Sequence, residues 1–425
     1  MFPRFRIAPE TTEWMTRPFV AATLLMGPVL GSAVSAVMVL AALLGAFQYL
    51  NDNYTITESR PRRLIYSFIL IWFAAEALFG LMHGGGPPMW LEIVENLPFL
   101  GFIIFVSGMA LSDKADLRRV IYAASPVAAL ITLAVVSVQV QVGSHRAEGM
   151  AGNAGPFAVL CLIQYGCCLL TAIETEGRAR LLGIAGAMAA AACVALSGMR
   201  GLWPCLFVIP AALAVLHRDV LRLFLWRGAL ATILIMAAVF VVGQASIERR
   251  IERFGSDVEA LQSGAGEITS LSQHLLIWRA GWSLFREAPL TGHGLGRNRQ
   301  LMAEQTRKTG NEEIGFSHFH NAILTEGVQT GIAGIAALLA MFLAPLFLAL
   351  RHAAGDAGRH GLAVISFTTI IYAFSGATGI MFGHDLMDAV WIAAISYGSF
   401  IAFGQGRPKE AAKDADAASG VSKEP

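Results

Sequence analysis

FSHFHNAILTEGVQTGIAG, residues 316–334, joins a long polar segment to an apolar run. An apolar run of about 20 residues is long enough to cross a bilayer as a helix, so the change in polarity predicts a membrane boundary at His320. Asn321 follows the histidine directly. Nine residues then separate Asn321 from Gly331, and two more separate Gly331 from Gly334. An imidazole and two helix-packing glycines therefore stand at fixed offsets where a span begins.

The composition is that of a polytopic membrane protein. Of 425 residues, 55% are hydrophobic and 14% are charged, and the mean hydropathy is +0.59. These values are too apolar for a soluble multi-domain protein. The formal net charge of +1 gives no support to a nucleic-acid-binding surface. All five cysteines fall inside apolar runs, which argues against disulfides and a zinc site and predicts small buried side chains: Cys161, Cys167, Cys168, Cys193 and Cys205.

Apolar runs predict an all-α integral membrane protein of about twelve transmembrane helices. Residues 18–50 are too long for one span, and Gly27, Pro28 and Gly31 predict two passes joined by a turn. No signal-peptide cleavage site is evident before this run, so we expect the first helix to stay as an anchor. The remaining predicted spans are 63–82, 96–111, 119–141, 156–173, 181–198, 201–217, 228–245, 327–350, 362–381 and 386–404.

Lysine and arginine concentrate in alternate connections, which predicts that those connections are cytoplasmic. They are Arg60, Arg62, Arg63, Lys114, Arg118, Arg119, Arg178, Arg180, Arg218, Arg222, Arg227, Arg351 and Arg359. If residues 18–50 cross twice, both termini are cytoplasmic. The predicted organisation is nine spans in 1–245, a periplasmic loop domain of helical segments in 246–318, three spans in 319–405 and a disordered cytoplasmic tail in 406–425.

The large loop contains two amphipathic segments, SIERRIERFGSDVEALQ (246–262) and ITSLSQHLLIWRAGWSLFREAP (268–289), which we expect to be helices on the membrane surface. Gly292, Gly294 and Gly296 follow. A turn there can bring backbone amides close to an anion, although a short glycine pattern alone is weak evidence.

Two boundary residues are suited to chemistry on a phosphorylated substrate. Arg200, in LSGMRGLWP between two spans, lies on the face where arginine is not expected. Its guanidinium can bind a diphosphate bidentately, or it can serve only to bond helix-end carbonyls and lipid phosphates. His320 has a usual pKa of about 6.5 and can accept a proton from a hydroxyl, or it can simply cap a helix.

The His-Asn, nine-residue, Gly, two-residue, Gly spacing resembles the signature of the bacterial O-antigen ligase and O-antigen polymerase superfamily. Ser197, Arg200 and Gly201 also fit the Ser-x-x-Arg-Gly-like corner of its ligases, and the resemblance covers mainly residues 190–345. It implies an O-antigen ligase in the bacterial inner membrane with its active site facing the periplasm. Such an enzyme moves a glycan from undecaprenyl diphosphate to a sugar hydroxyl of lipid A core, with inversion and without ATP, metal or other cofactor.

In the implied mechanism His320 is the general base, and Arg200 and Arg279 neutralise the diphosphate. The chain departs from the family at the second arginine. Ligase-like members place it about four residues before a tryptophan, where this chain has Gln273 and His274, whereas Arg279 follows Trp278. Either the arginine has moved along the helix or His274 replaces it. A purely structural interpretation makes Arg279 an interfacial anchor.

Further polar residues on the same predicted face are candidates for substrate binding, each with a structural alternative. Arg297 and Arg299 can guide an anionic lipid carrier or be solvated loop charges. His318 can support His320 or be a loop residue. The others are Asn321 beside the base, Arg146 with His145, Asp385 with His384, and Glu92 with Glu95, which can line a cavity.

Four functions remain open on the residues alone. They are an O-antigen ligase, a polymerase whose acceptor is a second lipid-linked glycan, a protein O-oligosaccharyltransferase and, as a non-enzyme, a lipid-glycan flippase or other transporter. We expect a monomer whose partners are the lipid-linked donor, the acceptor and membrane lipids. No motif for a metal or nucleotide appears where such a ligand would need it.

Overall fold

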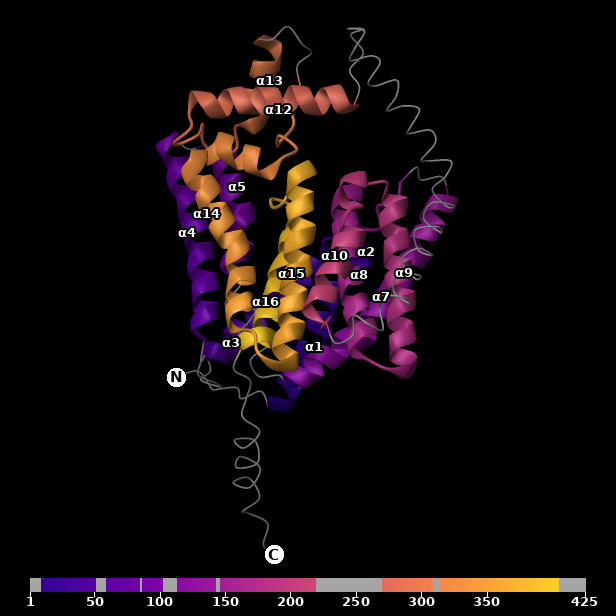
Figure 1. Ribbon diagram of the computed structural model, residues 1–425. Helices are drawn as coiled ribbons and strands as arrows, with labels where there is room; N and C mark the ends of the chain where they lie inside the picture. Colours follow the sequence, from indigo (N-terminus) through magenta and orange to yellow (C-terminus); the bar gives the residue numbers. More distant parts are fainter. Residues whose placement is uncertain are drawn as a thin grey trace, which may run out of the picture.

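The computed structural model describes residues 9–50, 59–84, 86–101, 113–142, 146–218, 270–308 and 314–404. Every regular element in these ranges is a helix (Figure 1). The elements are α1 (Pro9–Leu25), α2 (Gly27–Leu30), α3 (Ala33–Leu50), α4 (Arg60–Met82), α5 (Pro87–Leu100), α7 (Lys114–Gln141), α8 (Ala154–Glu174), α9 (Gly177–Ser197), the 3-10 helix η1 (Arg200–Leu202), α10 (Cys205–Leu216), α12 (Ser270–Glu287), α13 (Asn298–Lys308), α14 (Ala322–His352), α15 (Gly355–Thr378) and α16 (Asp385–Phe403).

Seven of the described helices are long and apolar enough to cross a membrane: α4, α7, α8, α9, α14, α15 and α16. Each overlaps a predicted span, with ends that differ from the predicted ones by at most seven residues. A long apolar run has few other ways to satisfy its backbone in lipid. The prediction of an all-α membrane protein is confirmed. Residues 33–44 and 200–216 form shorter apolar helices, and the total of about twelve spans stays a prediction.

The first apolar run breaks where its glycines and proline predicted. α1 ends at Leu25, the four-residue α2 begins at Gly27 with Pro28 in its first turn, and Gly31 has a φ of 55°. α3 starts afresh at Ala33 and packs against α1. The break predicted at Gly27-Pro28 is confirmed.

Several predictions concern residues outside the described ranges. These are the span at 228–245, most of the span at 96–111, the loop helix at 246–262, His145, Arg222 and Arg227, and the tail at 406–425.

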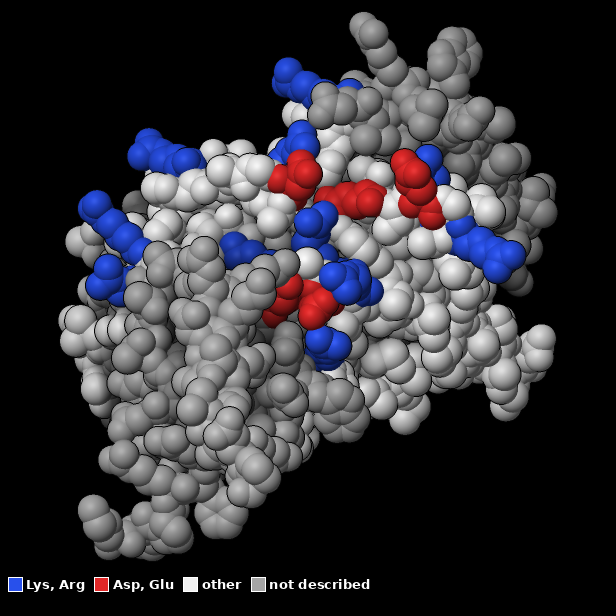
Figure 2. All heavy atoms as spheres, turned by 90° about the horizontal axis from the view of Figure 1, so that it is seen from below, with Lys and Arg blue, Asp and Glu red and all other residues white. Residues whose placement is uncertain are grey.

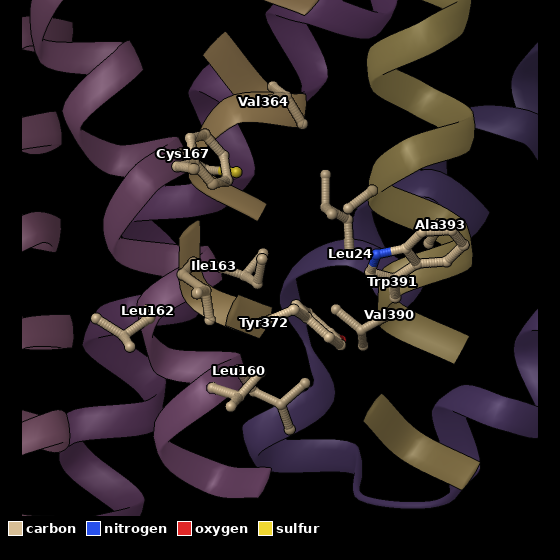
Figure 3. Packing of buried hydrophobic residues seen from close by; sticks show 14 of the residues in the cluster. Leu24, Leu160, Leu162, Ile163, Cys167, Val364, Tyr372, Val390, Trp391 and Ala393 are labelled. Carbon is tan, nitrogen blue, oxygen red and sulfur yellow. The ribbon is translucent and has the colours of Figure 1, made fainter. Parts of the chain in front are cut away.

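The core of the bundle is built around α8, α15 and α16. In α8 and α16, 89% and 94% of the apolar window is buried, against 28% in α4. Leu160 and Cys167 of α8, Val364 and Tyr372 of α15 and Trp391 of α16 belong to one buried cluster, and Figure 3 shows Cys167 on the side of Val364 and Tyr372 between Leu160 and Trp391. All five cysteines are free and buried, as predicted. α4 instead directs many large apolar side chains outward, as expected of a helix that faces lipid.

Basic side chains gather at the end of the bundle where α4, α7 and α9 begin and α14 ends (Figure 2). Lys114 Nζ donates to Ile401 O at 3.1 Å, and Arg118 lies 3.2 Å from Glu174, so the starts of α7 and the ends of α8 and α16 meet there. Residues assigned to alternate connections by the charge pattern are therefore neighbours in space.

α12 and α13 cover the opposite end of the bundle. α12 lies across the helix ends in Figure 1, with α13 above it. Ile277 and Leu284 of α12, Met302 of α13 and Val328 of α14 form a separate buried cluster around Phe319. The second loop helix is thus confirmed as a helix, and its apolar face packs on the protein.

Candidate functional site

The segment that carries His320 is fixed on both sides. Phe319 is fully buried in the cluster under α12, and its amide donates to Thr325 Oγ1 at 3.0 Å. Asn321 is the N-cap of α14, where its side chain accepts from the Leu324 amide at 3.0 Å. His320 lies between them with a φ of 50°, the one positive φ of a described residue other than glycine. Strained backbone of this kind persists only where its surroundings determine it.

Three histidines meet at this point. The ring centroid of His320 lies 4.4 Å from that of His318 and 4.9 Å from that of His274 in α12. The sequence left open whether the family's second arginine has moved to Arg279 or is replaced by His274. The structure places His274 next to His320. Neither helical spacing nor local pattern joins residues 274 and 320, so this contact could not be derived from the chain itself.

The surroundings lower the pKa of all three histidines. Burial lowers the pKa of His320 from its usual value, and the neighbouring His274 lowers it further. Burial and His320 lower the pKa of His318 to about 4, and burial lowers that of His274. His320 is thus neutral at pH 7, with a lone pair able to accept a proton.

Arg279 is not part of this cluster. It follows His274 by five residues, which places it about 140° further round the helix, and its side chain is exposed on α12. The buried face of α12 instead carries Ile277, Ala280 and Leu284. No hydrogen bond or ion pair holds the Arg279 guanidinium within the described parts of the chain.

α14 is broken at the first glycine of the signature. Gly331 has a φ of 68° and a ψ of −161°, a combination accessible essentially only to glycine. The break leaves backbone carbonyls of α14 without helical partners, and amides of the segment after α12 bind them. The His293 amide donates to Val328 O at 2.8 Å, and the Gly294 amide donates to Gln329 O at 2.9 Å. Gly331 packs closely, since a Cβ there would lie 2.4 Å from the Leu290 carbonyl carbon, and it also separates a short first segment of α14 from the rest.

Two of the three glycine amides after α12 are already hydrogen-bonded within the protein. Gly292 donates to Ala288 O at 3.0 Å, and the Gly294 amide is occupied as described above. These amides therefore bind the protein's own carbonyls.

The Arg200 corner is shaped by its neighbours. Ser197 Oγ donates to Val194 O at 2.6 Å and accepts from the Met199 amide, and a Cβ at Gly201 would lie 2.6 Å from Thr378 Oγ1. Ser197 and Gly201 therefore fit η1 against the end of α15. The Arg200 side chain is exposed, with no bonding partner among the residues described.

Arg200 and His320 lie at the same end of the bundle. Thr378, which η1 contacts, is followed directly by residues 379–383, and this turn lines one cavity together with His318. The Arg200 corner and the histidine cluster therefore flank a single turn.

The remaining candidates also lie at this end. Ala147 donates to Leu196 O at 3.2 Å, which places the exposed Arg146 beside the Arg200 corner. Arg297 donates to His293 O at 3.3 Å, and Arg299 is exposed on α13. Asp385 pairs with its neighbour His384 at 3.3 Å. Among the residues described, no hydrogen bond or ion pair joins Asp385 to His274, His318 or His320.

A cavity of about 280 Å³ lies under the histidine segment, bounded by α4, α5, α14 and the 379–383 turn. Glu92 and Glu95 line it, as the sequence suggested they can. Glu76 and Glu326 also line it and were missed. The signal for Glu76 was a carboxylate inside the predicted span 63–82, which is costly and therefore a functional candidate by default. Glu326 lies one residue before the predicted span 327–350.

Comparisons with known proteins show what the chain is similar to. A family model described as O-antigen ligase matches residues 166–339, which include Arg200, His274 and His320. An O-antigen ligase of Escherichia coli is 22% identical over 294 residues, covering 67% of this chain and 68% of that protein. An uncharacterized protein of Haemophilus influenzae is 27% identical over 306 residues, covering 69% and 74%. Over the matched residues the chain is similar to the O-antigen ligase superfamily.

Proposed function

We propose that the protein transfers a glycan from undecaprenyl diphosphate to a sugar hydroxyl of lipid A core. The match to the family model and the similarity to an O-antigen ligase support a glycosyltransferase of the O-antigen ligase or polymerase type. The observation that carries the residue assignment is the cluster of His320 with His274 and His318, at the same end of the bundle as Arg200.

In this proposal His320 takes the proton of the acceptor hydroxyl as its oxygen bonds to the anomeric carbon. The bond from that carbon to the diphosphate oxygen breaks, and the electron pair stays with the diphosphate. One displacement inverts the anomeric configuration. A neutral imidazole is required, and the burial that lowers the pKa of His320 favours it.

Arg200 stabilises the charge that develops on the leaving diphosphate, because a guanidinium fork matches phosphate oxygens. His274 is a poor substitute for an arginine here, since its lowered pKa keeps it neutral at pH 7. Arg146, beside the Arg200 corner, is placed to add positive charge. Arg279, Arg297 and Arg299 are exposed on α12 and near it, where they attract the anionic carrier.

The basic end of the bundle supports the orientation. Lysine and arginine favour the cytoplasmic side, so the end covered by α12 and α13 faces the periplasm of the inner membrane, where lipid-linked donors are consumed. Both termini are then cytoplasmic.

The acceptor is tested by reconstituting the purified chain in liposomes with a glycan on undecaprenyl diphosphate and no nucleotide. Lipid A core, a second lipid-linked glycan and a pilin-like protein are supplied separately. We expect transfer to lipid A core alone, with an inverted linkage by NMR. Elongation of the second lipid-linked glycan would identify a polymerase, and transfer to pilin would identify a protein O-oligosaccharyltransferase. Translocation without transfer would identify a flippase.

A further inference from the structure

The cavity under the histidine segment has an unusual lining. Four carboxylates face it, from Glu76 in α4, Glu92 and Glu95 in α5, and Glu326 in α14. Glu76 and Glu326 are 4% and 6% exposed. Among the described lining residues, His318 is the sole basic side chain.

These carboxylates are hydrogen-bonded to neutral groups. Asn96 donates to Glu76 and Gln329 donates to Glu92, each at 2.5 Å, and Thr330 donates to Glu326. No ion pair balances them within the parts of the chain that are described. A diphosphate would find no positive charge in this cavity, because His318 is the sole basic side chain among the described lining residues and its pKa is lowered to about 4. The donor's leaving group therefore belongs at the arginines outside it.

Two polar atoms of the cavity wall lack partners among the residues described. One is the indole N–H of Trp72, a side chain that is 2% exposed, and the other is Glu92 Oε2. A buried donor or acceptor without a partner is costly. A ligand that offers both hydroxyl donors and hydroxyl acceptors satisfies both atoms, because each hydroxyl has one donor and two lone pairs.

The shape and the remaining lining agree with a sugar. Trp72 and Phe382 supply apolar aromatic surface against which the C–H faces of a sugar ring can pack, and Asn96 and Gln329 supply amides. The described His, Cys, Asp and Glu side chains form no group arranged to hold a metal ion. The lining is therefore better suited to a polyol than to a divalent cation.

The family signature itself shapes this cavity. A Cβ at Gly334 would lie 1.7 Å from Thr330 Oγ1 and 2.5 Å from Glu326 Oε1. Only glycine at this position leaves room for the hydrogen bond that orients the Glu326 carboxyl.

We propose that this cavity binds the acceptor sugar, presents one of its hydroxyls to His320 past His318, and selects against acceptor sugars that carry phosphate or carboxylate groups. The inference rests on the proposed glycosyl transfer, since it assigns the acceptor side of that reaction. An uncharged sugar gains hydrogen bonds to the carboxyl groups, whereas an anionic sugar meets no cation among the described lining residues that would offset the loss of its hydration.

Steady-state transfer tests the assignment with Glu76→Gln and Glu326→Gln, and with the exposed Glu287→Gln at the end of α12 as control. Replacing a carboxyl that hydrogen-bonds the sugar should raise KM for a neutral acceptor about 10-fold and leave KM for the lipid-linked donor unchanged. Both variants should still discriminate against the same acceptor carrying a phosphate on its terminal sugar, because neither adds a cation to the cavity. A rise in donor KM, an unchanged acceptor KM in correctly folded variants, or equal use of the phosphorylated acceptor would overturn the proposal.

A binding measurement separates this inference from the proposed transfer, because it needs no turnover. Tryptophan fluorescence of the full chain is titrated with D-glucose, glucose 6-phosphate and D-glucosamine, and compared with Trp72→Phe. We expect a response to glucose that Trp72→Phe loses, and none to glucose 6-phosphate. A response to glucosamine alone would make the cavity a cation site, and a response to glucose 6-phosphate equal to that of glucose would remove the selectivity. Either result would overturn the proposal whether or not lipid A core is the acceptor.

Discussion

His320 is held in a left-handed backbone conformation between the buried Phe319 and the cap residue of α14. The residue and its neighbour Asn321 could be found from the sequence, because the boundary and the glycine offsets single them out. The residues that contact the His320 imidazole could not be found from the sequence. His274 reaches it from a helix that begins about 50 residues earlier, and the packing of that helix depends on tertiary contacts.

Removing the neighbouring imidazole should change the pH dependence of transfer. His274 lowers the pKa of His320, so His274→Gln should raise that pKa towards its usual value of about 6.5. The general base must be unprotonated, so the acid limb of the rate-pH profile should move to higher pH. Rates measured from pH 5 to 8 provide the test, with His352→Gln at the far end of α14 as control. A limb that stays in place or moves to lower pH would contradict the assignment.

A positive charge at position 200 should not be sufficient for full activity without the planar geometry of the guanidinium. Arg200→Lys keeps the charge but loses bidentate bonding to phosphate, so we expect kcat to fall about 10-fold or more. The exposed Arg286→Lys in α12 serves as the matched control. A kcat for Arg200→Lys equal to that of the control would show that Arg200 does not contact the leaving group.

At the level of the element, α14 has a break at Gly331 that the glycine spacing of the signature did not predict. The second part of the signature predicted a helix start with two packing glycines, and the start is where it was expected. The break at Gly331 was not predictable. The sequence does not distinguish a glycine that packs against a neighbouring segment from one that breaks its helix. Its role depends on Pro289, Leu290 and His293, which pack against the break.

Gly331→Ala should therefore destabilise the protein. A Cβ there would lie 2.4 Å from the Leu290 carbonyl carbon, in a conformation that costs a non-glycine residue about 1–3 kcal/mol before any clash. Thermal unfolding in detergent should show a clearly lower midpoint. Gly155→Ala in the first turn of α8, where a Cβ meets only ordinary contacts, should have little effect. Equal midpoints for the two variants would contradict the account of the break.

At the level of the whole molecule, the spans and the charged end were predictable because both follow from the membrane: apolar length sets the helices, and charge sorts their ends. The cavity was not. Its carboxylates come from α4, α5 and α14, and no local pattern states that these helices meet. The same holds for the turn at 379–383 that lies between Arg200 and His318.

The orientation can be measured with introduced cysteines, because the five native cysteines are buried. We expect a membrane-impermeant maleimide, added to spheroplasts, to label Arg299→Cys on α13 and not Arg359→Cys near the start of α15. Labelling of both positions after lysis shows that each is accessible. Labelling of position 359 alone in intact spheroplasts would reverse the orientation.

The central claim is that the His320 imidazole removes the proton of the acceptor hydroxyl. The most direct test is single-turnover transfer in liposomes preloaded with lipid-linked glycan and lipid A core, comparing His320→Ala with the exposed control His352→Ala. We predict a loss of about 10²-fold or more for His320→Ala with donor binding retained, and no loss for the control. Transfer by His320→Ala at the rate of the unmodified protein would contradict the claim.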